Sequence, residues 1–393
     1  MLFRSHTVTY GDAAPTVTPT YTGWVNSQGT GELTTAASCT TVYGTTTSVA
    51  ATAANRQTSC SGAVAANYAF TYVTGLVTVG KKNVDVTALN YTVNYADAVP
   101  TVTASYAGFI NGATSSVISG QSCVTAYTVT SNVGTTPSTS CSGGTATDYS
   151  FTYFPGTVTI NQKPITITAS SPTVTYGDAV PTVTAIYTLA NSQGSGVLSV
   201  QPTCTTTYTA TTHVADPTAN RTTSCSGATA ANYSFSYATG TVTVNRKGVT
   251  VTASSPTVTY GDAIPTITPT YAGWVNSEGP SVLTTPTTCT TVYTTSTSVA
   301  ASAANRQTSC SASAAADYSF TFPTGLVTVQ KKTVTVTASS HTVNYADAVP
   351  TVTASYAGFI NGATSSVISG QSCVTAYTVT SNVGTTPSTS CSG

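Results

Sequence analysis

A short motif that returns at a nearly constant spacing constrains this chain more than any other feature of its sequence. The tetrapeptide Tyr-Gly/Ala-Asp-Ala, followed two residues later by Pro, begins at Tyr10, Tyr95, Tyr176, Tyr260 and Tyr345. The successive intervals are 85, 81, 84 and 85 residues. A period of this kind indicates tandem supersecondary units or domains, and it outranks chain length as a guide to domain number.

Three further landmarks keep pace with this motif. An aromatic element begins at Tyr21, Tyr106, Tyr271 and Tyr356 and reads Tyr-Thr/Ala-Gly-Trp/Phe, and the third repeat departs from it at Tyr187-Thr188-Leu189. A Tyr-x-Phe triplet, preceded each time by Asn or Asp, begins at Tyr68, Tyr149, Tyr233 and Tyr318. A closing strand such as Thr157-Val158-Thr159-Ile160 follows each triplet. We therefore predict that each period is one complete structural module.

The landmarks divide the chain into five modules. The predicted modules are residues 1–82, 83–163, 164–247, 248–332 and 333–393. Residues 92–143 and 342–393 are identical, and the first repeat closely matches the fourth, so the order reads A-B-C-A-B. The first repeat lacks an opening strand and the fifth stops before its closing strands, so we expect the chain to be a segment of a longer protein. Each linker of two basic or polar residues is too short to be a flexible tether, which predicts semi-rigid stacking.

The local pattern predicts an all-β fold. Stretches such as residues 165–169 alternate apolar and hydroxyl residues with a period of two, which places Val and Ile on the core face and Thr on the solvent face. Residues 48–56 are Ala-rich, but the third repeat has Asp216-Pro217 at the same place, so a loop or single helical turn is expected there. Residues 114–118 are a second candidate turn. Six or seven short strands in about 80 residues predict an elongated array of Ig-like β-sandwich modules, with a grasp-like sheet as the alternative.

The ten cysteines fall two to a repeat, at separations of 21 or 18 residues. The predicted pairs are Cys39 and Cys60, Cys123 and Cys141, Cys204 and Cys225, Cys289 and Cys310, and Cys373 and Cys391. An even count in phase with the repeat favours one disulfide per module over a pair of buried free thiols. A zinc site is less consistent with the sequence, because it contains no Cys-x-x-Cys pair. Disulfides of this kind indicate an oxidising compartment.

Composition excludes several partners. Asp, Glu, Lys and Arg make up 6% of the 393 residues, and 11 basic residues balance 11 acidic ones, against about 25% charged residues in an average domain. Nucleic acids and anionic membranes attract clustered Lys and Arg, so neither is an expected partner. No run reaches the 18 apolar residues of a membrane-spanning helix, and residues 1–5 have no signal-peptide hydrophobic region. The 23 Tyr and 9 Phe supply material for a core and disfavour disorder.

Together, these residues resemble the MBG domain of the YGX type. The resemblance rests on the order Thr-Val-Thr-Tyr-Gly-Asp-Ala-Val-Pro, Tyr-Ala-Gly-Phe, paired Cys, Asn-Tyr-Ser-Phe and Gly-Thr-Val-Thr-Val, and it covers essentially the whole chain. Ala96 and Ala346 replace the motif Gly, which makes a positive φ less expected there. The family recurs in long repetitive bacterial surface and adhesin-like proteins, so the resemblance implies a cell-surface location and a structural or adhesive role. It brings no catalytic residues.

The sequence offers no catalytic constellation, so we expect no enzyme, cofactor or metal. There is no Gly-x-Ser-x-Gly elbow or phosphate-binding loop, and His6, His213 and His341 occupy positions typical of exposed turns. The motif Asp residues, which could bind calcium at module junctions, are more simply explained as bonding their own turn backbone. They are Asp12, Asp97, Asp178, Asp262 and Asp347.

The junctions and aromatic elements raise two other hypotheses. Tyr21 with Trp24, and Tyr271 with Trp274, could stack on sugar rings, although regularly spaced aromatics usually form core. The junction lysines could form Lys-Asn isopeptide bonds, although charges that protect exposed strand ends are the simpler interpretation. They are Lys81, Lys82, Lys163, Lys247, Lys331 and Lys332, beside Arg246. The leading prediction is a stalk or spacer segment of a secreted bacterial surface protein, and the alternative is an adhesive module that binds host glycan or protein.

Overall fold

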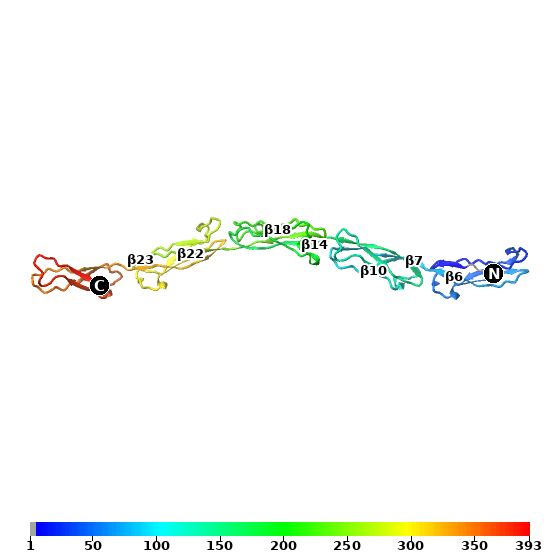
Figure 1. Ribbon diagram of the computed structural model, residues 1–393, viewed down its shortest axis with the longest axis horizontal. Helices are drawn as coiled ribbons and strands as arrows, with labels where there is room; N and C mark the ends of the chain where they lie inside the picture. The colour runs from blue at the N-terminus through cyan, green and yellow to red at the C-terminus, as the bar shows by residue number, and fades with distance from the viewer. Residues whose placement is uncertain (1–4) are drawn as a thin grey trace. The chain divides into compact units, whose positions relative to one another are not determined.

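The computed structural model describes residues 5–393 and consists of short β-strands joined by turns (Figure 1). The prediction of an all-β chain is confirmed, and the helical elements in this range are single 3₁₀ turns such as η2 (Ala53–Arg56) and η3 (Ser115–Val117). These two turns lie in the segments where the sequence predicted a helical turn. The interpretation of the first four residues as lacking a signal sequence lies outside the described residues.

The second repeat shows the architecture most completely. Its strands are β7 (Lys82–Ala88), β8 (Tyr91–Asn94), β9 (Ala104–Ala107), β10 (Ser122–Thr125), β11 (Ser138–Ser142), β12 (Tyr149–Phe154) and β13 (Gly156–Asn161). They form two sheets, one with the order β9-β7-β12 and the other with the order β8-β13-β11-β10. The core contains side chains from both sheets, among them Val84 and Val86 of β7 and Cys141 of β11. This two-layer arrangement is the predicted sandwich rather than one sheet folded over a turn.

Two long strand segments connect the sheets of this repeat. Strand β7 gives way to β8 after two residues, and β12 gives way to β13 after Pro155, so each segment starts in one sheet and ends in the other. The two segments run parallel, with Tyr149 opposite Lys82 in one sheet and Val158 opposite Tyr91 in the other. The remaining pairings within the sheets are antiparallel. The first and last strands of the repeat therefore hold each other along most of their length.

The alternation of Thr with Val or Ile produces the buried face of each sheet. In β13, Val158 and Ile160 are 0% and 4% exposed, while the intervening Thr157 and Thr159 face solvent. Because side chains in a strand point alternately to opposite faces, each apolar residue of β13 enters the core and each Thr of β13 faces solvent. The predicted core and solvent faces are confirmed.

The other repeats contain matching strands. In the first they are β1 (His6–Thr9), β2 (Leu33–Thr35), β3 (Ser38–Thr41), β4 (Gln57–Ser61), β5 (Val64–Ala65) and β6 (Gly75–Gly80). In the third they are β14 (Lys163–Ala169), β15 (Thr173–Thr175), β16 (Ala185–Ile186), β17 (Thr203–Thr206), β18 (Thr222–Ser226), β19 (Tyr233–Ala238), β20 (Gly240–Thr241) and β21 (Thr243–Asn245).

The fourth and fifth repeats follow the same order. The fourth has β22 (Lys247–Ala253), β23 (Thr257–Thr259), β24 (Pro269–Ala272), β25 (Thr288–Thr291), β26 (Gln307–Ser311), β27 (Tyr318–Thr321), β28 (Gly325–Leu326) and β29 (Thr328–Gln330). The fifth has β30 (Thr335–Ala338), β31 (Ala354–Ala357), β32 (Ser372–Thr375) and β33 (Thr389–Ser392). The parallel pairing of the first and last strands recurs in the fourth repeat as β22 with β27 and β23 with β29.

The chain divides into two compact units, and the division falls inside the third repeat. One unit comprises Met1–Ile167, Ile186–Thr203 and Ser226–Ala238, and the other comprises Thr168–Ala185, Cys204–Cys225 and Thr239–Gly393. In the second unit, one apolar cluster joins Val174 and Tyr176 of the third repeat to Val249 and Tyr318 of the fourth. The predicted module boundaries remain a proposal about the sequence repeat. The packing continues across the repeat boundaries within each unit.

Candidate functional site in the turns, bridges and junctions

The motif Asp closes its own turn in every repeat. Its Oδ2 accepts a hydrogen bond of 2.7–2.8 Å from the amide three residues earlier, on Thr9, Asn94, Thr175, Thr259 and Asn344 in turn. Its own amide donates back to the carbonyl of that same residue, as from Asp12 to Thr9 at 2.9 Å. This reciprocal bonding supports the simpler interpretation of the Asp. In residues 5–393, no three His, Cys, Asp or Glu side chains gather as a metal site would require.

The expectation that Ala96 and Ala346 avoid a positive φ is wrong. Ala96 has φ 64° and Ala346 has φ 69°, in the left-handed region that Gly11, Gly177 and Gly261 occupy in the other repeats. The Asp bonds on either side determine the turn, and their combined stabilisation exceeds the strain of an alanine in this conformation.

A buried tyrosine four residues after the first Cys of each repeat completes the turn. The hydroxyl donates to the main-chain carbonyl of the motif Asp at 2.8–3.1 Å in the pairs Tyr43–Asp12, Tyr127–Asp97, Tyr208–Asp178, Tyr293–Asp262 and Tyr377–Asp347. Burial raises the pKa of Tyr43, Tyr127, Tyr208 and Tyr293, so each hydroxyl stays a donor. The sequence interpretation missed these residues, although their fixed spacing from Cys was a usable signal.

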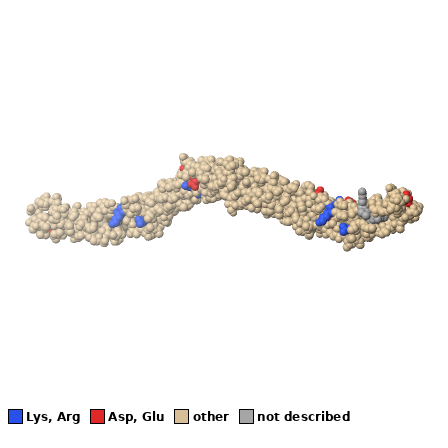
Figure 2. All heavy atoms as spheres, turned by 45° about the vertical axis from the view of Figure 1, so that its right-hand side comes forward, with Lys and Arg blue, Asp and Glu red and all other residues tan. Residues whose placement is uncertain are grey.

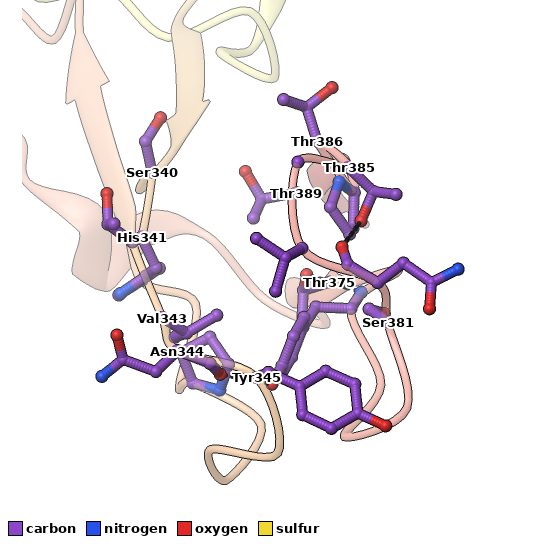
Figure 3. Close-up of a pocket in the computed structure, with 17 residues that line it drawn as sticks. Ser340, His341, Val343, Asn344, Tyr345, Thr375, Ser381, Thr385, Thr386 and Thr389 are labelled. Carbon is purple, nitrogen blue, oxygen red and sulfur yellow. Dashed lines mark hydrogen bonds between the residues drawn. The ribbon is translucent and has the colours of Figure 1, made fainter.

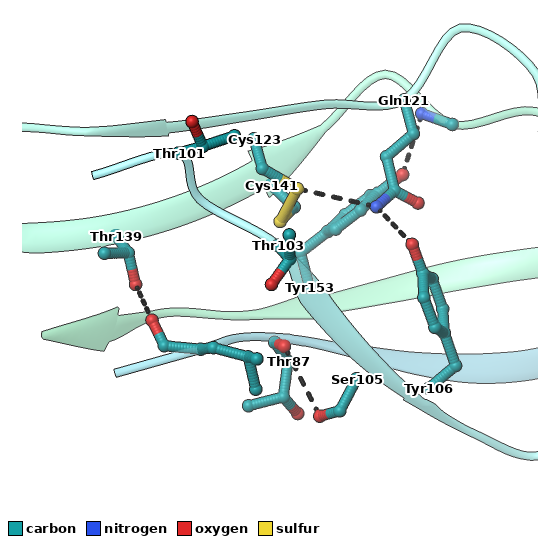
Figure 4. Close-up of a disulfide and its surroundings, with 12 residues drawn as sticks. Thr87, Thr101, Thr103, Ser105, Tyr106, Gln121, Cys123, Thr139, Cys141 and Tyr153 are labelled. Atoms are coloured by element: carbon teal, nitrogen blue, oxygen red, sulfur yellow. Dashed lines mark hydrogen bonds between the residues drawn. A yellow bond between two sulfur atoms is a disulfide. The ribbon is translucent and has the colours of Figure 1, made fainter. Parts of the chain in front are cut away.

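Each pair of cysteines forms a disulfide between neighbouring antiparallel strands. The joined pairs are Cys39–Cys60, Cys123–Cys141, Cys204–Cys225, Cys289–Cys310 and Cys373–Cys391. In the second repeat the two residues face each other across β10 and β11, with Cα atoms 4.0 Å apart (Figure 4). Gln121 lies over this bridge and donates to the Tyr106 hydroxyl at 2.8 Å. The bridge therefore joins the paired strands and lies beside the aromatic element.

The aromatic elements pack against the Tyr-x-Phe strand. Trp274 meets Tyr318 edge-to-face at 4.7 Å, and Trp24 meets Tyr68 in the same way at 4.7 Å. The Tyr271 hydroxyl donates to Thr287 Oγ1 at 2.7 Å. These rings are half-buried and already have aromatic partners, so they act mainly as core, the simpler of the two interpretations made from the sequence.

At the first three junctions the chain passes from one repeat to the next through a single linker residue, whereas four residues, 331–334, separate β29 from β30 at the last. Strand β6 ends at Gly80 and β7 begins at Lys82, and the residue between them donates to a carbonyl of the following repeat, from Lys81 Nζ to Ala146 O at 2.7 Å. Arg246 makes the matching bond to Ala316 O at 3.0 Å. The linker is thus tied to the repeat that it introduces.

In the second, third and fourth repeats, the residue before the Tyr-x-Phe triplet anchors a loop of the preceding repeat. Asp148 Oδ1 accepts from the Val49 amide at 2.7 Å, Asn232 Oδ1 from the Val133 amide at 2.9 Å, and Asp317 Oδ1 from the Val214 amide at 2.7 Å. The sequence had shown this Asn or Asp without indicating its role.

A second contact repeats at the same three junctions. The motif Tyr of one repeat meets the triplet Tyr of the next edge-to-face, with ring centroids 5.5 Å apart for Tyr10–Tyr149, 5.4 Å for Tyr95–Tyr233 and 5.5 Å for Tyr176–Tyr318. Tyr95 and Tyr176 are 2% and 1% exposed. Successive repeats are therefore joined through an apolar contact as well as hydrogen bonds.

At two junctions a basic side chain also meets an Asp carboxylate. Lys163 Nζ lies 2.8 Å from Asp97 Oδ1, and its ammonium holds the pKa of Asp97 below its usual value. This contact is an ion pair, and the lysine faces a carboxylate rather than the Asn that the isopeptide hypothesis requires. His213 Nδ1 lies 2.7 Å from Asp317 Oδ2, and this bond raises the pKa of His213.

Elsewhere the described surface has few charged side chains. Figure 2 shows isolated groups of Lys and Arg on a face that is otherwise almost uncharged. A groove of about 570 Å³ in the fifth repeat is lined by residues 340–345 and 375–389 (Figure 3). In the second repeat, β13 lies at the corresponding place between β8 and β11. Within the described range no helix is long and apolar enough to cross a membrane.

The two-sheet repeat, its bridge and its recurring junctions define an all-β tandem-repeat protein. The family model described as MBG domain (YGX type) matches residues 4–78, 84–159 and 249–328, which is more than half of the chain. The chain belongs to the MBG domain (YGX type) family. No curated protein matches it. The solved structure described as Sidekick-1 immunoglobulin domains 1-4 is similar at 11% identity over 70% of this chain and 82% of that chain, but its TM-score of 0.22 is too low to support an argument.

Proposed function

We propose that this chain is a spacer segment of a secreted bacterial surface protein, which holds a separate functional region away from the cell. The observation that carries the proposal is the construction of the junctions. At the first three junctions a closing strand leads through one residue into the next opening strand, and equivalent amide, carbonyl and tyrosine contacts then secure the following repeat. Junctions built in this way resist bending, as a spacer requires.

Location outside the cell is supported by the cysteines and the surface. All ten Cys are joined within repeats, and such bridges persist in oxidising compartments. The nearly uncharged, hydroxyl-rich exterior gives no electrostatic patch for nucleic acid or anionic lipid. A non-enzymatic role fits the same features, because the polar contacts described above bond the turns and junctions themselves. A glycan-binding role for the Tyr–Trp pairs is less well supported, since these rings pack against Tyr68 and Tyr318.

Small-angle X-ray scattering of the full chain tests the spacer role. Strands rise about 3.3 Å per residue, so five repeats of roughly 35 Å give an array of about 150–175 Å and a radius of gyration of about 43–50 Å. A compact protein of this length would have a radius of gyration of about 21 Å. A value close to the compact one would refute the proposal.

A matched pair of insertions tests the junctions themselves. A Gly-Ser-Gly-Ser insertion between Lys81 and Lys82 lengthens the linker, and we expect it to broaden the distribution of interatomic distances. The same insertion between Gly29 and Thr30 lies in the equivalent loop of the first repeat, whose hydrogen bonds in the described residues stay within that repeat, and it should leave the distribution unchanged. Equal effects of the two insertions would show that the short linker does not control the geometry.

A further inference from the structure

One pair of positions contributes side chains of matched size to every junction. The first position is the Gly or Ala of the Tyr-Gly/Ala-Asp-Ala motif. The second is the residue that precedes a left-handed Asn in the following repeat, where Asn111, Asn191, Asn276 and Asn361 have φ of 52–54°. Gly11 faces Ile110, Gly177 faces Val275 and Gly261 faces Ile360. Ala96 and Ala190 occupy the equivalent positions at the second junction, where Asn191 Nδ2 donates to Val129 O as Asn111 Nδ2 donates to Thr45 O at the first.

Three of the four pairs combine glycine with a large residue. A Cβ added at Gly11 would stand 1.9 Å from Ile110 Cδ1, and one at Gly261 would stand 1.8 Å from Ile360 Cδ1. At Gly177 it would stand 2.7 Å from Val275 Cβ, which no side-chain rotation can relieve. The large side chain therefore fills the space that the missing Cβ leaves.

The remaining junction differs at both positions together. Ala96 supplies the Cβ that the other three turns lack, and Ala190 is the smallest of the four facing residues. The polar contact of this junction changes as well. Asn232 bonds the Asn132 side chain at 2.8 Å, whereas Asp148 and Asp317 bond Ser48 and His213. Two separate contacts thus distinguish the second junction from the first and third.

We infer that the size of this pair determines which repeat can follow which. A repeat with a glycine turn accepts a follower with Ile or Val, and a repeat with an alanine turn accepts a follower with Ala. The inference concerns recognition between repeats and does not depend on the spacer role. It also defines the partner that fits the turn of Ala346, beside which Tyr345 is 60% exposed. That partner is a repeat with alanine immediately before its left-handed Asn, as in the third repeat.

Amide hydrogen exchange of the full chain tests this inference at the second junction. Ala190→Ile should overpack the space beside Ala96 and raise exchange of the Val133 amide, which donates to Asn232, by about tenfold. The Val49 amide at the first junction should not change. Adding Ala96→Gly should return the Val133 rate to within about threefold of the parent protein. An unchanged rate in Ala190→Ile, or a failure of the second substitution to restore it, would overturn the inference.

The first junction provides the reverse experiment and a backbone control. Gly11→Ala should raise exchange of the Val49 amide, and Ile110→Ala in the same chain should cancel the part that comes from the clash. Gly23→Ala measures the cost of alanine at a similar φ, because Gly23 has φ 96° and no heavy atom within 4 Å of an added Cβ. Size matching does not operate here if Gly11→Ala raises amide exchange no more than Gly23→Ala does. The same conclusion follows if the effects of Gly11→Ala and Ile110→Ala on exchange of the Val49 amide are additive.

Discussion

Removal of one buried hydroxyl should loosen a whole repeat turn. Tyr208 is 1% exposed, and its hydroxyl donates to the Asp178 carbonyl at 2.9 Å. Tyr208→Phe keeps the ring volume, so it adds no cavity and removes only this hydrogen bond. Loss of a buried bond that leaves its acceptor without a partner costs about 1–2 kcal/mol. The opening equilibrium of the turn should therefore rise about 5- to 30-fold.

Amide hydrogen exchange resolved by residue measures this effect. The informative amides are those of Thr175, which donates to the Asp178 carboxylate, and Tyr176, which donates to Asn245 O at 2.8 Å. Both should lose protection by this factor if the turn opens as a unit. The comparison is with Tyr187→Phe, because the Tyr187 hydroxyl makes no hydrogen bond to the described part of the chain. If the two variants exchange alike, the hydroxyl bond does not stabilise the turn and our account of the buried tyrosines is wrong.

Three other predictions address the bridge, the charged junction and the core. Replacing Cys123 and Cys141 together by Ala should lower the stability of the second repeat by about 3 kcal/mol, seen as faster exchange there and unchanged exchange in the fourth repeat. Asp317 raises the pKa of His213. The contact therefore stabilises the junction fully at pH values below the unfolded-state pKa of His213, and this stabilisation is lost as the pH rises through the folded-state pKa. The protection factors of the junction amides should therefore fall as the solution becomes alkaline. His213→Asn should remove that dependence, and its persistence would contradict the assignment. Gly156→Ala should destabilise the second repeat by about 1–3 kcal/mol, measured by denaturant-dependent exchange, because its Cβ would stand 2.5 Å from a carbonyl oxygen.

Local features of the fold were predictable, whereas distant pairings were not. The alternation of Thr with Val predicted the strands, and the recurring motif predicted the turns that contain Asp. The parallel pairing of β7 with β12 joins residues about 65 positions apart, for which no local pattern exists. The same limit explains why Tyr43 and its counterparts were missed, since each bonds a carbonyl about 30 residues earlier.

Two other results depended on the surroundings of a residue. The φ of Ala96 follows from the bonds of its neighbours, which override the preference of alanine for negative φ. The division of the chain inside the third repeat follows from packing across the repeat boundary, which a period in the sequence does not reveal.

The parallel pairing of the first and last strands has a mechanical consequence. In the second repeat, tension would enter at Lys82, leave at Asn161 and load the hydrogen bonds of β7 with β12 and β8 with β13 in shear rather than one at a time. If those pairs broke, the Cys123–Cys141 bridge would still shield the 18 residues of its loop from the load. At about 3.4 Å per extended residue, each repeat that unfolds with its disulfide intact is roughly 60 Å shorter than one without the bridge. An oxidised repeat would therefore lengthen less under force than a reduced one.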